Sequence, residues 1–136
     1  MNRRKLGRYN AHYLALMRNL SIALVEHGRI QTTVQKAKEL RRYVEPLITV
    51  AKTNNLTTYK TLLSKLLNNR KAVNQLIKIG ELNKNRNGGY TSIKRLFVRE
   101  NDSAIVSEIR IIDYPTVDSS SNSSNDFANE SPTIEA

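Results

Sequence analysis

The sequence contains no cysteine. That absence excludes a disulfide scaffold, a zinc knuckle and a thiol nucleophile. No apolar run approaches the roughly 18 residues that a membrane-spanning helix requires. The N-terminus is basic but lacks the apolar stretch of a secretory signal. We therefore expect a protein that stays in the cytoplasm and has no membrane partner.

Groups suited to catalysis are also scarce. His12 and His27 are the two histidines, and neither has a carboxylate at the spacing of a metal site or a catalytic triad. His12 precedes an apolar run, which favours a helix start or a phosphate contact, and His27 suits the last turn of a helix. Gly88-Gly89 lacks the third glycine of a phosphate-binding loop and lies between a helix and a strand, the wrong order. The sequence predicts no enzyme, cofactor, metal or small-molecule substrate.

Positive charge is the abundant feature. The 22 Lys and Arg residues against 12 Asp and Glu give a net charge of +10. Residues 1–114 hold all 22 basic residues and eight of the acids, a net of +14, whereas residues 115–136 hold four acids and no base. A body this basic predicts a polyanionic partner, which is either nucleic acid or an anionic membrane surface.

The 136 residues have room for one domain and divide into three parts. Residues 1–10 form a basic, extended arm with no apolar period. Residues 11–114 form a single domain of the α+β class, with about four helices and a small mixed sheet that includes a C-terminal β-hairpin. Residues 115–136 are rich in Ser and Asn, and we expect this tail to be disordered.

The first two helices have the clearest signals. Apolar residues at three- and four-residue spacing predict a helix over 11–27. Asn10 is its expected N-cap, and Gly28 stands where a glycine ends a helix. A brief strand at 29–31 follows. Thr32-Thr33-Val34-Gln35 then has the pattern of a capping box, which predicts that the second helix starts at the first of these residues.

The second helix continues beyond a proline. Its apolar period persists through Pro46, so we expect a kink there and not a break. A third helix is capped by Thr57 or Thr58 and ends before Asn68-Asn69. A fourth, short helix ends near Gly80, and a polar loop leads on to the hairpin.

The hairpin is predicted from two β-branched and aromatic segments. Residues 90–99 and 104–112 flank a stretch with turn chemistry. The first segment contains the continuously apolar Leu96-Phe97-Val98, which predicts a bulge or burial on two sides.

Basic residues gather in three places. The arm has no packing role, so its charges suit phosphates. The second helix has cations near its N-terminal end, where the helix dipole disfavours them and an external anion would compensate. The hairpin supplies Lys94, Arg95 and Arg99. For Lys60, Lys65, Lys71 and Lys78, a merely solvated face is equally expected. No RNP aromatic pair or helix-turn-helix is present, so we expect contacts to backbone and shape.

Two segments resemble the bacterial large-subunit ribosomal protein seventeen family. Residues 32–52, TTVQKAKELRRYVEPLITVAK, resemble its main signature, as does Arg18-Asn19-Leu20 upstream. Residues 86–93, RNGGYTSI, are similar to its second signature. The likeness covers about residues 3–112.

This resemblance implies a structural constituent of the large ribosomal subunit that binds ribosomal RNA and supports subunit assembly and translation. Its implied partners are large-subunit ribosomal RNA and neighbouring ribosomal proteins. The chain departs from the family at Tyr13 and Leu14, where basic residues are common, and at Ser92, which replaces an arginine. From the basic clusters and the resemblance together, the expected RNA-binding residues are Arg3, Arg4, Lys5, Arg8, His12, Arg18, Asn19, Thr32, Thr33, Lys36, Lys38, Arg41, Arg42, Lys52, Arg86, Gly88, Gly89, Tyr90, Lys94 and Arg95.

Two other hypotheses remain open. A nucleoid or regulatory DNA-binding protein would bind duplex DNA comparably well. A membrane-surface protein would need an amphipathic helix with exposed leucines, and the leucines of this sequence suit a core better.

Overall fold

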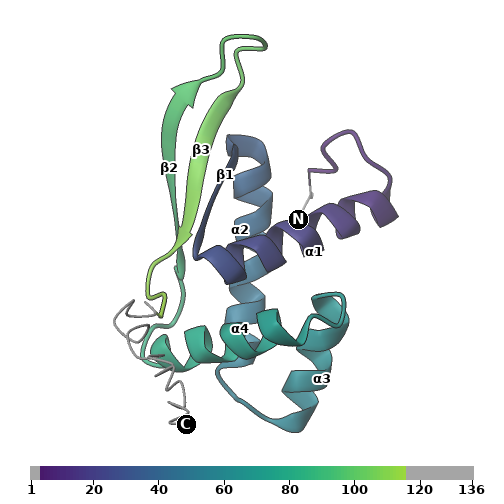
Figure 1. Cartoon of the computed structure of the whole chain (residues 1–136), viewed down its shortest axis with the longest axis vertical. Coiled ribbons are helices and arrows are strands. Elements are labelled where there is room, and N and C mark those ends of the chain that lie inside the picture. Colours follow the sequence, from purple (N-terminus) through teal and green to yellow (C-terminus); the bar gives the residue numbers. More distant parts are fainter. Residues whose placement is uncertain (1–3, 116–136) are drawn as a thin grey trace, which may run out of the picture.

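A computed structural model describes residues 4–115. Arg3 and the tail of residues 116–136 lie outside the described part of the chain. The elements, shown in Figure 1, are α1 (Asn10–His27), β1 (Arg29–Thr33), α2 (Val34–Ala51), α3 (Leu56–Lys65), α4 (Arg70–Leu82), β2 (Thr91–Val98) and β3 (Ile105–Ile111). The predicted α+β class, with four helices and a C-terminal hairpin in a small sheet, is confirmed.

The sheet has the strand order β1-β3-β2. Both pairs are antiparallel, where we expected a mixed sheet. Helices α1 and α2 pack on one face, against which Ile109 and Ile111 are buried. The expected bulge is present, because the β2–β3 register shifts between Arg95 and Phe97. On the opposite face, called the open face below, Arg29, Lys94 and Arg110 are exposed within the described part of the chain.

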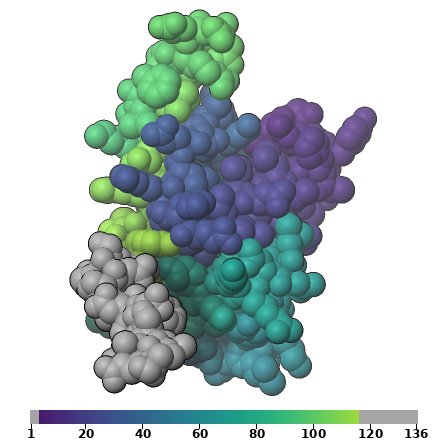
Figure 2. All heavy atoms as spheres, viewed as in Figure 1, coloured from purple at the N-terminus to yellow at the C-terminus, as the bar shows by residue number. Residues whose placement is uncertain are grey.

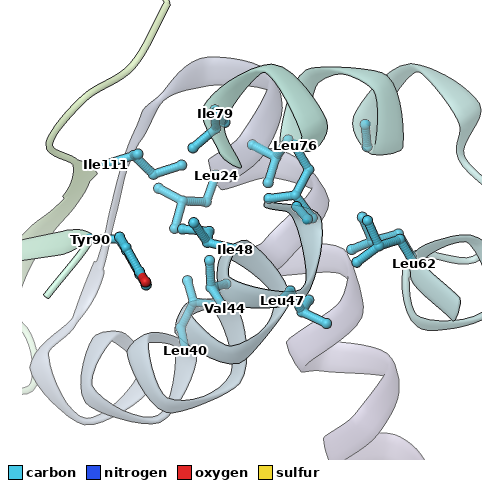
Figure 3. Packing of buried hydrophobic residues seen from close by; sticks show 14 of the residues in the cluster. Leu24, Leu40, Val44, Leu47, Ile48, Leu62, Leu76, Ile79, Tyr90 and Ile111 are labelled. Atoms are coloured by element: carbon cyan, nitrogen blue, oxygen red, sulfur yellow. The ribbon is translucent and has the colours of Figure 1, made fainter. Parts of the chain in front are cut away.

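Helix α2 lies at the centre of the molecule. Its apolar stripe is buried along the whole helix, as the sequence predicted, and consists of Val34, Ala37, Leu40, Val44, Leu47, Ile48 and Ala51. Figure 3 shows this stripe facing Leu24 of α1, Leu76 of α4 and Tyr90. The helix continues through Pro46, whose ring is exposed. A fully buried stripe means that α2 presents only its other side to solvent.

Helix α4 crosses the end of α2 at a glycine. A Cβ on Gly80 would lie 2.9 Å from the carbonyl carbon of Ala51. The helix ends at Leu82, two residues beyond Gly80, which agrees with the predicted end near that glycine. Gly80 also permits the close helix crossing, a role that the sequence did not indicate.

The start of α2 differs from the prediction. Thr32 belongs to β1, where it pairs with Ser107 of β3, and its carbonyl accepts a hydrogen bond of 3.2 Å from the Ser107 hydroxyl. Thr33 is the N-cap, but its side chain makes no capping hydrogen bond. The predicted capping box is therefore wrong, because sheet pairing uses the threonine that would have capped the helix.

Two other predicted caps are also wrong. Asn10 is already helical, and Tyr9 precedes the helix as its N-cap without a side-chain bond. Helix α3 begins at Leu56 after Asn55, so Thr57 and Thr58 lie inside it. Neither helix start has a side-chain capping hydrogen bond.

The end of α1 is closed by a distant tyrosine. Gly28 has φ 72°, and its N–H donates to the Leu24 carbonyl at 2.8 Å, as predicted for a glycine that ends a helix. The Tyr114 ring packs on Gly28 so closely that a Cβ there would lie 2.8 Å from it. The Tyr114 hydroxyl donates to the carbonyls of Val25 and Glu26 at 3.0 and 2.7 Å. This contact ties the segment after the hairpin to the first helix.

Gly28→Ala should therefore lower the free energy of unfolding by about 2–4 kcal/mol, because it adds both a positive-φ cost and an overlap with Tyr114. Gly7→Ala is a matched control. Gly7 has φ +69° but nothing within 4 Å of a Cβ, so only about 1 kcal/mol is expected. Urea unfolding measures both variants. Equal losses would contradict the role of the Tyr114 contact.

Candidate nucleic-acid interface

The described part of the arm turns and does not run straight. The Arg8 N–H donates to the Lys5 carbonyl at 3.0 Å, and Leu6 and Gly7 have positive φ. Leu6 packs against the core, while Arg4 and Lys5 are exposed. Arg8 is half-buried and donates from Nη1 to the Leu6 carbonyl at 2.9 Å. One apolar side chain therefore anchors the arm and leaves the charges before it free to reach a ligand.

A buried carboxylate joins the start of α1 to α2. Glu39 is 2% exposed. Its Oε2 accepts a hydrogen bond of 3.3 Å from the Tyr13 hydroxyl, and its Oε1 lies 3.5 Å from Nη1 of Arg42. A charge this buried needs such partners. The contact places the first turn of α1, where His12 is exposed, beside the basic segment of α2, and it positions Arg42.

The solvent side of α2 carries the predicted basic cluster. Lys38, Arg41 and Arg42 are exposed, and Lys36 is half-buried. The Arg41 Nε lies 3.1 Å from Oε1 of Glu45. Exposed pairs of this kind contribute little stability, so Arg41 can leave its partner for a phosphate at small cost.

A groove connects this side of α2 to the loop before β2. It has a volume of about 600 Å³. Its lining comes from both segments that resemble the ribosomal family, namely Arg42, Glu45, Pro46, Thr49 and Val50 of α2 with Asn87, Gly88 and Tyr90. The Thr91 hydroxyl donates to Glu45 at 3.0 Å and fixes the loop beside the helix. The fold thus brings the two sequence motifs together.

Three further predicted residues, Lys52, Arg86 and Tyr90, also have partners inside the protein. The Lys52 ammonium donates to the Arg86 carbonyl and lies 4.7 Å from the centre of the Tyr90 ring. Hydrogen bonds from Lys52 and Thr49 lower the pKa of the Tyr90 phenol, and Tyr90 is 1% exposed. The Arg86 guanidinium lies 3.1 Å from Asp113. These contacts hold the shape of the loop.

The hairpin stands apart from the α2 cluster. Lys94 and Arg95 of β2 are exposed, and the hairpin tip projects beyond the helices in Figure 2. Arg99 lies 2.6 Å from Asp102 across the turn. Its hydrogen bonds lower the pKa of that carboxyl to about 2, so the pair stays ionised at neutral pH and stiffens the tip.

The remaining predicted residues are scattered over α1, β1 and the loop. Asn19 is exposed on α1, and Arg18 is half-buried, with its Nε buried and unbonded within the described residues. Thr32 and Thr33 are half-buried in β1. Gly89 has φ +66°, a conformation that supports the turn into β2.

Sequence reasoning missed one basic pair. Arg29 of β1 and Arg110 of β3 lie directly opposite each other in the sheet. The alternation of β3 placed Arg110 on the face away from the core, but nothing local in the sequence indicates which residue of another strand it pairs with.

No group of three or more His, Asp or Glu side chains within residues 4–115 could hold a metal ion. None of the helices in that range is long and apolar enough to cross a membrane.

Comparison with known proteins gives a consistent result. Residues 16–112 match the family of ribosomal protein L17. The Large ribosomal subunit protein bL17 of Sulfurimonas denitrificans is 46% identical over 110 residues, covering 80% of this chain and 94% of that protein. The protein of the same name from Campylobacter jejuni subsp. doylei is 44% identical over 80% of this chain and 93% of its own length. That from Persephonella marina is 48% identical over 74% of this chain and 83% of its own length. The chain belongs to the ribosomal protein L17 family.

Proposed function

We propose that this protein is a structural constituent of the large ribosomal subunit, that it binds ribosomal RNA through phosphate and shape contacts, and that it thereby supports subunit assembly and translation. The observation that carries the proposal is the groove that joins the basic side of α2 to the loop before β2, with the first turn of α1 beside that side of the helix. Family membership supports the ribosomal setting, because the relatives are named as large-subunit proteins.

Charge supports RNA as the ligand of this surface. The first turn of α2 contains no acidic residue, and Lys36 and Lys38 lie near its N-terminal end. The helix dipole is unfavourable to cations at that end. An external phosphate removes the conflict, since it interacts favourably with both the dipole and the ammonium groups.

Preorganisation supports recognition of shape over base sequence. Glu39 Oε1 lies 3.5 Å from Nη1 of Arg42, and this contact restricts the orientation of the guanidinium. A guanidinium of restricted orientation suits a phosphate at a defined position. The groove beside Gly88 gives the RNA backbone room to approach the protein backbone.

The hairpin tip supports contact with a neighbouring ribosomal protein. Phe97 and Val98 are 56% and 57% exposed, and Leu96 is 37% exposed. Adjacent exposed apolar side chains of this kind are typical of protein contact sites. We therefore assign RNA to the basic surface and protein neighbours to the tip.

RNA binding should depend steeply on salt. If roughly six to ten phosphates are contacted, affinity for a large-subunit ribosomal RNA fragment should fall about 10³- to 10⁵-fold between 50 and 200 mM salt. Fluorescence anisotropy at several salt concentrations measures this slope. A shallow slope would contradict phosphate-dominated binding. Equal affinity for duplex DNA would favour a nucleoid protein, and flotation with anionic vesicles would favour a membrane-surface protein.

Removal of residues 2–5 should weaken RNA binding without changing cooperative unfolding, because the deletion removes three arm charges but keeps Leu6. About 1 unit of salt slope is expected for each phosphate contact that is lost. Leu6→Ala is the matched control, with a lower melting temperature and an unchanged slope. A deletion that unfolds the protein would disprove the separation of binding from folding.

Gly88→Ala should leave the melting temperature unchanged, since a Cβ there meets nothing within 4 Å. RNA affinity should fall, because the methyl group enters the groove between the loop and α2. Gly89→Ala provides the contrast, since φ +66° makes that variant less stable. If Gly88→Ala binds RNA as tightly as the wild type, the groove is not part of the interface.

A further inference from the structure

The open face of the sheet carries a row of polar residues that the proposed RNA surface does not use. In the register of the three strands, Arg29 of β1 lies opposite Arg110 of β3, and Arg110 lies opposite Ser92 of β2. Both arginines are exposed. The next row consists of Ile30, Ile93 and Ile109, which point to the other face of the sheet. Ile109 belongs to the core, and Ile30 and Ile93 pack against it.

This register places two like charges side by side. Like charges directly opposite each other on adjacent strands destabilise a sheet. Neither guanidinium makes a hydrogen bond or an ion pair within residues 4–115. The protein therefore contains an unfavourable pair that its own described residues do not neutralise.

The nearest acid on this face does not remove the imbalance. Glu108 lies two residues before Arg110 on β3. Lys94 of β2 is directly opposite Glu108 on one side, and Gln31 of β1 is opposite it on the other. Together Arg29, Arg110 and Lys94 against Glu108 leave a local charge of +2. The row of the two arginines is thus the electropositive part of the open face.

We infer that Arg29 and Arg110 hold a phosphate group of the RNA backbone between them on the open face of the sheet, with Ser92 as a further donor. An anion between the two guanidiniums turns their repulsion into two attractions, and each guanidinium offers forked donors that match phosphate oxygens. Arg110 lines a hollow of about 400 Å³ together with Ser92, Ile93, Lys94 and Glu108. Arg29 lines a second hollow of about 320 Å³ together with Ile30, Gln31 and Glu108.

This inference rests on the proposed function for the source of the phosphate, and it adds a second contact surface. Helices α1 and α2 cover the opposite face of the sheet. The site is therefore separate from the basic side of α2, so RNA would contact the protein on two sides.

The test compares R29Q/R110Q with K60Q/K78Q, which removes the same charge from exposed positions on α3 and α4. The probe is a large-subunit ribosomal RNA fragment, titrated at several salt concentrations. For R29Q/R110Q we expect about tenfold weaker binding or more and a salt slope lower by about 1, relative to the control variant. Its melting temperature should be unchanged or higher, because the repulsion between the strands is gone.

The variant R29K/R110K shows whether weaker binding comes from the loss of charge or from a folding defect. It should keep the slope, since both charges remain, but lose part of the affinity, since lysine lacks the fork. A loss of slope in R29K/R110K equal to that in R29Q/R110Q would overturn the inference.

The other outcomes are also decisive. If the wild type binds RNA steeply and R29Q/R110Q behaves like K60Q/K78Q, the sheet site is wrong and the proposed function stands. If the wild type does not bind the RNA, the proposed function fails and this inference fails with it.

NMR signals of the Nε–H groups of Arg29 and Arg110 distinguish an RNA phosphate from free inorganic phosphate as the ligand of this site. Signals that shift with RNA and only weakly with inorganic phosphate support the RNA backbone, and saturation by micromolar inorganic phosphate overturns it.

Discussion

The packing of α2 is the interaction on which the rest of the structure depends. Helix α2 contacts α1, α3, α4 and all three strands, more elements than any other helix of residues 4–115. Because one side of α2 is fully used in the core, its other side is held in place as a rigid solvent surface. The proposed RNA-binding residues of that side lie on the same helix that holds the core together.

Burial and charge are coupled along this helix. Glu39 is 2% exposed and contacts the Tyr13 hydroxyl and the Arg42 guanidinium. Loss of one partner would leave a buried charge uncompensated, so the contact both fixes the α1–α2 angle and restricts the arginine above it. Lys52 follows the C-terminal end of α2 and holds the loop before β2 through its contacts with Arg86 and Tyr90. The contacts of Glu39 and Lys52 therefore hold the basic side of α2 and the loop before β2 in place.

Local signals predicted the features that adjacent residues determine. The apolar stripe of α2, the glycine that ends α1 and the bulged hairpin follow from spacing and residue type alone. Features set by distant partners were not predictable in this way. Thr32 became a strand residue because Ser107 lies beside it in the sheet, and Arg29 meets Arg110 because of a register between strands far apart in sequence. A cluster of charges within one segment, as at Lys38, is visible from the sequence, whereas a pair of charges that two strands bring together is not.

The central claim is that the basic side of α2 faces RNA phosphates inside the large ribosomal subunit. A cryo-EM map of the host organism's ribosome tests it most directly. If the basic side of α2 binds RNA, we expect the map to show this chain in the large subunit, with phosphate oxygens within hydrogen-bonding distance of Lys38, Arg41 and Arg42. A map in which that side of α2 faces solvent or another protein, with RNA bound elsewhere, would contradict it.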